Sequence, residues 1–323
     1  MTDTDFFGAD KTIFLDFSRI FVIIKVSYQN RTERKFSSMS QTLYKKTDTL
    51  SDSVFQNPPS EYRGAPFWAW NGDLREEYLA EQIDAFEKMG LGGAHLHVRT
   101  GLTLPYLGKE HMERIRFCTE KFKEKHMLSY LYDEDRWPSG AAGGIVTKNI
   151  KYRAKAMCLT LNERKEDEFT KLLAVYDITL DADGCLAHYE RTEKDAPIAD
   201  GAFRRYAYRV IDRGPDSWYN GQTYVDTLDP EAIREFIHVT YEAYLNKVGD
   251  EFGKTIPSIF TDEPQFKFKS QPTFSNDTRD LGIPWTELLP EKYKKAYGED
   301  ILDFLPEMFW ELPNGIASPL PSA

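Results

Sequence analysis

The sequence predicts an α/β fold containing part of a (β/α)8 barrel, with about four strand–helix units and an antiparallel β insertion after the third strand. Short apolar runs alternate with amphipathic stretches of helical length, which is typical of parallel strands joined by right-handed crossovers. Further along, three runs alternate with a period near two, as antiparallel strands do. The apolar run at 256–260 then ends in two adjacent acids, as strands do at the rim of such a barrel.

The first part of the barrel region is expected to hold three strands separated by two helices. The expected elements are strands at 67–70, 93–98 and 128–132 and helices at 74–89 and 110–126. In the first helix Leu79, Ile83 and Phe86 recur at helical spacing, and Gly90 follows the last turn. These lengths favour parallel pairing of the three strands.

The period-two pattern marks the insertion. Its runs lie at 154–161, 172–180 and 203–211, and Asp183-Gly184 between two such runs indicates a hairpin turn. A helix is then expected from Asp229-Pro230-Glu231 to about residue 248, because proline and acids favour a first helical turn. After residue 268 the sequence shows helix-like stretches at 285–297 and 301–310 and no further convincing barrel strand.

The strand count sets the expected domain organisation. A closed barrel needs eight strands, and this sequence offers four, so we expect a fragment of a larger enzyme or a degraded gene product. Met39 is an alternative natural start. The expected segments are a poorly structured N-terminal extension at 1–57, the first barrel strands and helices at 58–150, a β-rich insertion at 151–225, a barrel continuation at 226–312 and a frayed tail at 313–323.

Composition argues against several classes of partner. The formal net charge of −11 disfavours nucleic acid and an anionic membrane surface. The apolar run at 17–26 is too short to span a bilayer, and it lacks the basic start and cleavage site of a secretory signal. The 3 cysteines are widely spaced and suggest neither a disulfide framework nor a zinc site. We therefore expect a cytoplasmic protein.

Acidic, aromatic and histidine side chains gather at the ends of the four expected barrel strands. The predicted catalytic residues are Glu263 and Asp262, and the predicted substrate-binding residues are Trp68, Trp70, Asn71, His95, His97, Arg99, Asp133, Asp135, Arg136 and Trp137. Cleavage of a glycosidic bond needs one carboxyl group to protonate the leaving oxygen and a second as base or nucleophile, while aromatic rings seat the sugar. The acids and aromatic residues at these strand ends therefore predict cleavage of a glycosidic bond.

Each of these features also has a structural interpretation. The tryptophans could simply pack in the core, and His95 and His97, which share one face of a strand, could line the barrel or be core residues. The acids from Asp133 to Asp135 could form a loop neutralised by Arg136, or could hold sugar hydroxyls or a hard cation such as calcium. No metal site is predicted from the sequence pattern alone. The glycine-rich stretch 139–144 permits close approach of a ligand but lacks the lysine of a phosphate loop.

Three motifs together resemble the start of the catalytic barrel in glycoside hydrolase family 106 and its uncharacterised bacterial relatives. They are Pro66-Phe67-Trp68-Ala69-Trp70-Asn71-Gly72, Met89-Gly90-Leu91-Gly92-Gly93 and Trp137-Pro138-Ser139-Gly140-Ala141-Ala142-Gly143-Gly144. The resemblance covers about 65–149 and 256–265, and it implies a (β/α)8 barrel, acid/base carboxylates and, as in the α-L-rhamnosidases of that family, a supporting calcium. By the same resemblance, Glu263 matches the position of the acid. Members of this type are much longer and take the partner carboxylate from a later strand.

The leading hypothesis is therefore part of the catalytic domain of an α-L-rhamnosidase-like glycoside hydrolase, with an oligosaccharide or glycoside as substrate and no required cofactor. One alternative is a non-catalytic carbohydrate-binding protein or an inactive truncated gene product. Another is a lyase or metal-assisted hydrolase that uses His95 and His97. The sugar, the stereochemical outcome, the second carboxylate and the oligomeric state stay open.

Overall fold

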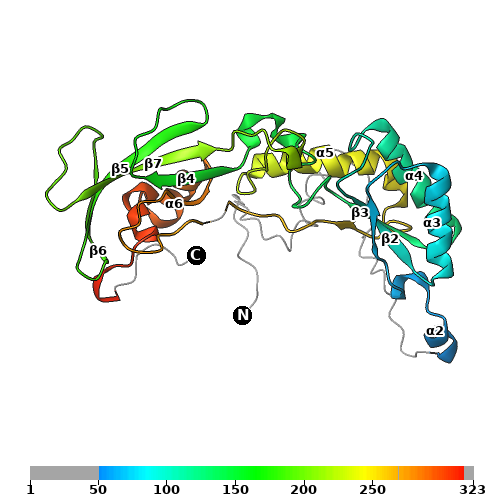
Figure 1. Ribbon diagram of the computed structural model, residues 1–323. Helices are drawn as coiled ribbons and strands as arrows, with labels where there is room; N and C mark the ends of the chain where they lie inside the picture. Colours follow the sequence, from blue (N-terminus) through cyan, green and yellow to red (C-terminus); the bar gives the residue numbers. More distant parts are fainter. Residues whose placement is uncertain (1–50, 268, 316–323) are drawn as a thin grey trace, which may run out of the picture. The chain divides into compact units, whose positions relative to one another are not determined.

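The computed structural model describes residues 51–267 and 269–315 (Figure 1). The expectations about residues 1–50, including the apolar run at 17–26 and the alternative start at Met39, lie outside the described residues, as does most of the expected tail. The rest of the expected N-terminal extension begins with a short helix, α2 (Asp52–Gln56), in which Ser51 caps the first turn.

A parallel sheet of four strands forms the first part of the fold. Its order is β1-β2-β3-β8, and every neighbouring pair is parallel. The strands are β1 (Phe67–Trp70), β2 (Gly93–Val98), β3 (Leu128–Tyr132) and β8 (Ile259–Phe260). The first three have the predicted bounds, but the fourth is shorter than expected, because Pro257 lacks the N–H group that a paired strand residue donates.

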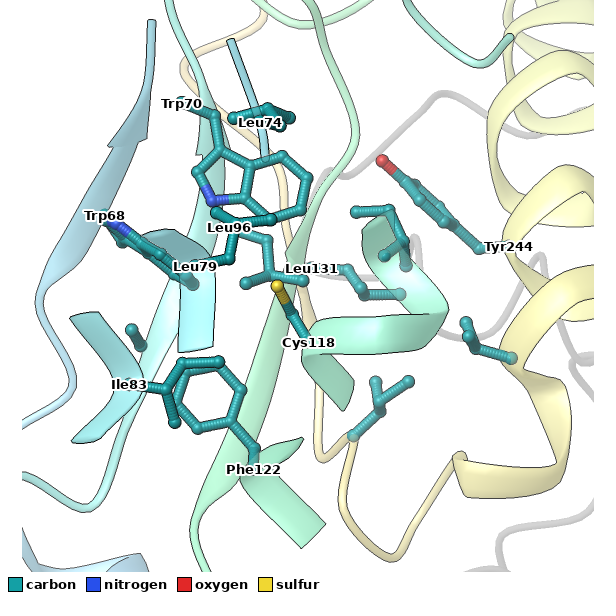
Figure 2. Close-up of a cluster of buried hydrophobic side chains, with 14 of the residues drawn as sticks. Trp68, Trp70, Leu74, Leu79, Ile83, Leu96, Cys118, Phe122, Leu131 and Tyr244 are labelled. Atoms are coloured by element: carbon teal, nitrogen blue, oxygen red, sulfur yellow. The ribbon is translucent and has the colours of Figure 1, made fainter. Parts of the chain in front are cut away.

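Helices cover one face of this sheet and form a core with it. They are α3 (Glu76–Lys88), α4 (Lys109–Glu124) and α5 (Pro230–Val248). Figure 2 shows Ile83, Cys118 and Phe122 from α3 and α4 packed beside Leu96 and Leu131 of the sheet. Burial of this apolar cluster is the main source of stability for the parallel part of the fold.

Trp68 and Trp70 belong to the same core, and this corrects the prediction that they contact a substrate. Their exposed fractions are 6% and 1%. Alternate residues of a strand point to opposite faces, and these two indoles take the face that packs against Phe86, Phe122 and other helix residues. Their role in this structure is core packing, with the Trp68 indole donating to Gln82 at 2.8 Å.

An antiparallel sheet of five strands forms the second part of the fold. The strands are β4 (Lys155–Thr160), β5 (Thr170–Leu180), β6 (Leu186–Thr192), β7 (Phe203–Ile211) and β9 (Leu281–Trp285), in the order β6-β5-β7-β4-β9. A hairpin turn does lie at Asp183-Gly184, but it joins β5 to β6, a strand that was not predicted, and Gly184 adopts the left-handed φ of 83° that the turn needs. The antiparallel insertion after the third strand is therefore confirmed.

The strand β9 was not predicted, and it corrects the expected helix at 285–297. The helix α6 (Leu289–Tyr297) starts later, and Trp285 instead ends β9, which pairs with β4. Gly282 and Pro284 conceal the strand in the sequence; Pro284 is tolerated because β9 lies at the edge of the sheet. Instead of continuing a barrel, residues 281–310 complete a second core around Tyr176, Trp285 and Trp310.

Short 3-10 turns make up most of the remaining regular structure. The stretch expected as a helix at 301–310 consists of two of them, Ile301–Asp303 and Leu305–Met308. The others are Ser60–Tyr62, Val146–Lys148, Ile150–Tyr152, Ser217–Tyr219, Gly249–Glu251 and Pro313–Gly315. Among the described residues, no helix is long and apolar enough to cross a membrane.

The architecture is thus mixed α/β, with one parallel and one antiparallel sheet. The sheet of β1, β2, β3 and β8 has the parallel order and the helical layer expected of barrel units. The described residues do not close this sheet into a barrel, so the partial barrel remains an interpretation of these four strands.

Candidate functional site

A row of rings occupies the face of the parallel sheet opposite Trp68 and Trp70. His97 stacks on Tyr132 with ring centroids 3.9 Å apart, and His95 stacks on Tyr130 at 4.6 Å. Phe67 of β1 lies 4.7 Å from His97 and 5.0 Å from Phe260 of β8, and it is 53% exposed. The strand alternation that buries the tryptophans thus places these rings on the opposite face, where Phe67 is exposed and His97 and Tyr132 are buried.

Both predicted histidines lie on this face. His95 Nδ1 is 3.2 Å from the carbonyl oxygen of Ala65, whereas neither ring nitrogen of the buried His97 has a hydrogen-bond partner among the described residues. Burial lowers the pKa of His97 to about 4, and the charges of Arg99 and His95 act in the same direction. The His97 imidazole is therefore neutral at pH 7.

Asp262 projects from the end of β8 toward these rings. The Tyr132 hydroxyl donates to Asp262 Oδ2 at 3.1 Å, and His97 Nε2 lies 3.9 Å from the same oxygen. Burial raises the pKa of Asp262, the hydrogen bond from Tyr132 and the charge of Arg99 oppose this, and the neighbouring charge of Glu263 adds to it. A carboxyl group in this setting holds a proton more readily than one in water.

Glu263 is the exposed member of the acidic pair. The Trp137 indole donates to Glu263 Oε2 at 3.1 Å, which orients the carboxylate. Glu263 also has φ of +42°, a left-handed conformation that non-glycine residues rarely adopt. Such strain concentrates at functional sites. The Trp218 indole donates in turn to the carbonyl oxygen of Trp137, and no sequence pattern had singled out Trp218.

Asp133 is fully buried and bonded within the protein. Its carboxylate accepts hydrogen bonds from Ser139 Oγ at 2.6 Å and from Tyr241 Oη and Thr261 Oγ1 at 2.7 Å each. Burial raises its pKa to about 6, while these hydroxyls act in the opposite direction. Ser139 Oγ also accepts from the backbone N–H of Asp262 at 2.8 Å. Asp133 therefore helps to position the end of β8. Its complete burial corrects the prediction that it contacts a substrate.

The glycine-rich loop closes around Glu134. Oε2 of this buried carboxylate accepts from the backbone N–H groups of Gly140, Ala141 and Ala142, and Oε1 accepts from those of Asp135 and Gly143. Successive N–H groups in such turns form an anion-binding concavity. The close backbone approach that the glycines permit is thus used by a carboxylate of the chain itself.

The other predicted site residues divide between a loop and two strand ends. Asp135 Oδ2 lies 3.5 Å from Arg136 Nε and accepts from the side-chain amide of Asn220 at 2.9 Å, so the neutralised-loop interpretation describes this pair. Asn71 and Arg99 follow β1 and β2 and are exposed. The structure brings Arg99 close enough to influence Asp262 and His97 electrostatically.

Asp133 and Asp135, which the sequence offered as possible ligands of calcium, do not fit that role. Both oxygens of Asp133 already accept hydrogen bonds from hydroxyl groups, and Asp135 is engaged by Asn220. Within residues 51–267 and 269–315 no group of three or more His, Cys, Asp or Glu side chains could hold a metal ion. The metal-assisted alternative based on His95 and His97 therefore has no third protein ligand there.

Comparisons with known proteins give a similarity of structure and none of sequence. No protein-family model matches the chain, and no curated protein matches it. Among solved structures, it is similar to a rhamnosidase from Novosphingobium sp. PP1Y, with 12% sequence identity and a TM-score of 0.49. The alignment covers 80% of this chain and 42% of the rhamnosidase chain. This chain thus spans less than half the length of that protein.

Proposed function

We propose that the ring-lined face of the parallel sheet binds a carbohydrate and that Glu263 is the general acid in cleavage of a glycosidic bond. The chain would then be part of the catalytic domain of a glycoside hydrolase, α-L-rhamnosidase-like by its motifs. The observation that carries the proposal is the position of Asp262 and Glu263, which follow β8 after Thr261 and lie beside aromatic rings.

The chemistry needs a proton donor, a second carboxylate and a surface for the sugar. Glu263 is exposed and held by the Trp137 indole, so it can present a proton to a leaving oxygen. Asp262 is the neighbouring carboxylate on the same strand end, and Phe67 and Trp137 offer apolar faces for a sugar ring. Asn71 and Arg99 can donate hydrogen bonds to sugar hydroxyls from the adjacent strand ends.

Substitution of Glu263 tests this role. The chain should be assayed on an aryl glycoside with a good leaving group and on a methyl glycoside with a poor one. Glu263→Gln should lower turnover of the methyl glycoside by about 10²–10⁴-fold and affect the aryl glycoside less, since only the poor leaving group needs the proton. Glu77→Gln on the exposed surface of α3 is the matched control. Normal turnover of the methyl glycoside by Glu263→Gln would show that the assigned role is wrong.

A non-catalytic carbohydrate-binding protein is the second candidate. Two other acids at the strand ends, Asp133 and Glu134, are fully buried and hydrogen-bonded within the protein, which favours this candidate. They leave Asp262 and Glu263, which are adjacent residues on one strand end. Sugar binding measured by calorimetry, with no product after prolonged incubation with aryl glycosides, would select this candidate.

The proposal also covers compartment and partners. Cys118, Cys158 and Cys185 are unpaired, in keeping with the reducing cytoplasm that we propose. The net charge of −11 supports a neutral or cationic partner over nucleic acid.

A further inference from the structure

We propose that the loop at 216–222, which follows β7, positions Glu263 for proton transfer and that Trp218 is its main positioning residue. We call these residues the clamp loop. The Trp218 indole donates to the carbonyl oxygen of Trp137, and the Trp137 indole donates to the Glu263 carboxylate. The catalytic meaning of this arrangement rests on the proposed role of Glu263 as general acid. The inference gives a function to a segment that no sequence pattern connects with the acids.

The clamp loop is closed by its own hydrogen bonds. Asp216 Oδ1 accepts from the backbone N–H of Trp218 at 2.8 Å and caps the 3-10 turn. The backbone N–H of Asp216 donates to the carbonyl oxygen of Gln222 at 3.0 Å, and the N–H of Gly221 donates to the carbonyl oxygen of Asp216 at 2.8 Å. Trp218 therefore projects from a loop whose backbone is held at both ends.

Arg136 fastens the clamp loop to the chain beside Trp137. Its guanidinium donates to the carbonyl oxygens of Ser217, at 2.9 Å, and Trp218, at 3.2 Å. The other terminal nitrogen donates to Asn220 Oδ1 at 3.1 Å. A planar guanidinium that donates to several acceptors of one turn fixes the orientation of the turn as well as its distance. Because Arg136 and Trp137 are adjacent in the chain, the clamp loop is bonded to both.

The glycine-rich stretch allows the clamp loop to come this close. A Cβ atom on Gly144 would collide with the carbonyl oxygen of Tyr219, and Gly144 has a left-handed φ of 85°. Asn220 Nδ2 donates to the carbonyl oxygen of Gly143 at 2.9 Å. Gly143 also donates its N–H to the buried carboxylate of Glu134. The glycine-rich stretch is thus held by Glu134 and by the clamp loop together.

The position of Trp137 matters because Glu263 is an exposed side chain with several rotamers. The Trp137 indole donates to its carboxylate at 3.1 Å and restricts that freedom. A general acid gives its proton to the leaving oxygen while the bond from the sugar carbon breaks and its electron pair passes to that oxygen. This transfer needs the acid within hydrogen-bond reach of the oxygen. Displacement of Trp137 should therefore lower turnover without weakening substrate binding.

NMR of the full chain tests the clamp loop without requiring activity. Each of the 6 tryptophans gives one indole N–H signal after labelling with nitrogen-15, and the signal lost in Trp137→Phe is that of Trp137. Glu263→Gln changes the acceptor of this N–H and should move the signal. In Trp218→Phe the same substitution should move it by about half as much or less, because the two residues are coupled through Trp137. Trp310→Phe removes another indole donor to a backbone carbonyl and is the matched control, which should leave the movement unchanged.

Kinetics with the methyl and aryl glycosides test what the clamp loop does for catalysis. Trp218→Phe keeps an aromatic ring and loses the N–H donor. It should lower kcat for the methyl glycoside by about tenfold, affect the aryl glycoside less and leave KM unchanged. In the Glu263→Gln background it should cause no further loss, since a positioning residue acts only through the group that it positions.

Asn220→Gly is a second variant in case Trp218→Phe disturbs folding. Glycine accepts the left-handed φ of 52° at this position, and the substitution removes the side-chain bonds to Asp135 and Gly143. It should reduce the response of the Trp137 signal in the same way.

Each result bears on the clamp loop. A Trp137 signal that does not respond to Glu263→Gln, or that responds equally in Trp218→Phe, would overturn the inference. A raised KM with unchanged kcat would overturn it as well, by showing that Trp218 contacts the substrate itself. A loss of turnover that adds to the loss in Glu263→Gln would indicate a purely structural role for Trp218. Coupling at Trp137 in a protein that cleaves neither glycoside would keep the clamp loop and contradict the proposed function.

Discussion

Glu134 shows how a residue that contacts no ligand can fix the geometry of the site. Five backbone N–H groups donate to its carboxylate, and four of them come from the glycine-rich loop. Trp137, which orients Glu263, precedes that loop by two residues, and Ser139, which binds the backbone of Asp262, begins it. Burial raises the pKa of Glu134, and the N–H groups oppose this. Because both oxygens only accept, the ionised form fits these contacts.

We predict that Glu134→Gln destabilises the protein. The amide NH2 group would face N–H donors that now have no acceptor, and each unpaired donor costs about 1–3 kcal/mol. The free energy of unfolding, measured with urea, should fall by about 2–3 kcal/mol. Glu120→Gln on the exposed surface of α4 is the control and should leave it unchanged. Unchanged stability of Glu134→Gln would show that Glu134 is protonated and already resembles an amide.

The sequence predicted where the acids lie but not which of them are buried. The end of β8 could be located because an apolar run stops at two acids. The fate of Asp133 depends on Tyr241 and Thr261, which lie 108 and 128 residues away in the sequence. Partners this distant follow from the packing of α5 and β8 against β3, which local patterns do not encode. The prediction for Trp68 and Trp70 of β1 was wrong for a related reason. The sequence of a short strand does not show which of its two faces the helices cover.

At the scale of single elements, α5 illustrates a helix that local sequence specifies well. Asp229 accepts a hydrogen bond from the N–H group of Glu231 at 2.9 Å, and Pro230 occupies the first helical position. Asp229→Ala should lower the free energy of unfolding by about 1 kcal/mol, and Asp229→Ser should restore most of it. Urea unfolding of the two variants checks this. Equal losses of unfolding free energy in Asp229→Ala and Asp229→Ser would mean that the capping hydrogen bond does not contribute to stability.

The first turn of α4 contains a histidine with a predictable pH effect. His111 is buried, and its Nδ1 accepts from the backbone N–H of Leu107 at 3.2 Å. Burial lowers its pKa from 6.5 to about 4, so the unfolded chain binds a proton that the folded chain refuses. The stabilisation is present above pH 6.5 and is lost as the pH falls toward 4, by on the order of 3 kcal/mol.

The variant His111→Gln isolates this effect. Wild type and variant should differ most in free energy of unfolding at pH 7 and least near pH 4, because the variant has no imidazole to protonate. His97 titrates in the same direction and is present in both proteins, so it cancels in the comparison. A difference that is constant from pH 7 to pH 4 would contradict the assignment to His111.

At the scale of the molecule, the described residues contain two separate hydrophobic cores. One joins the parallel sheet to α3, α4 and α5, and the other joins the antiparallel sheet to α6 and the following turns. The sequence predicted the four parallel strands and, of the antiparallel sheet, β4, β5 and β7, since strand periodicity is local, but it did not predict β6 or β9. It could not predict that β9 returns to β4, because that pairing joins segments separated by α5 and β8. Four strands counted along the chain likewise do not determine whether a sheet closes.

Separate cores imply that damage to one should stay local. Trp285 is buried in the second core, and Trp285→Ala should destabilise that region by about 3–5 kcal/mol. Amide hydrogen exchange should become faster in β4, β7 and β9 and stay unchanged in β2 and β3, because stability is distributed over cooperative units. Phe122→Ala in the first core is the reciprocal variant and should give the opposite pattern. Loss of protection in both sheets from either substitution would show that the two cores unfold as one unit.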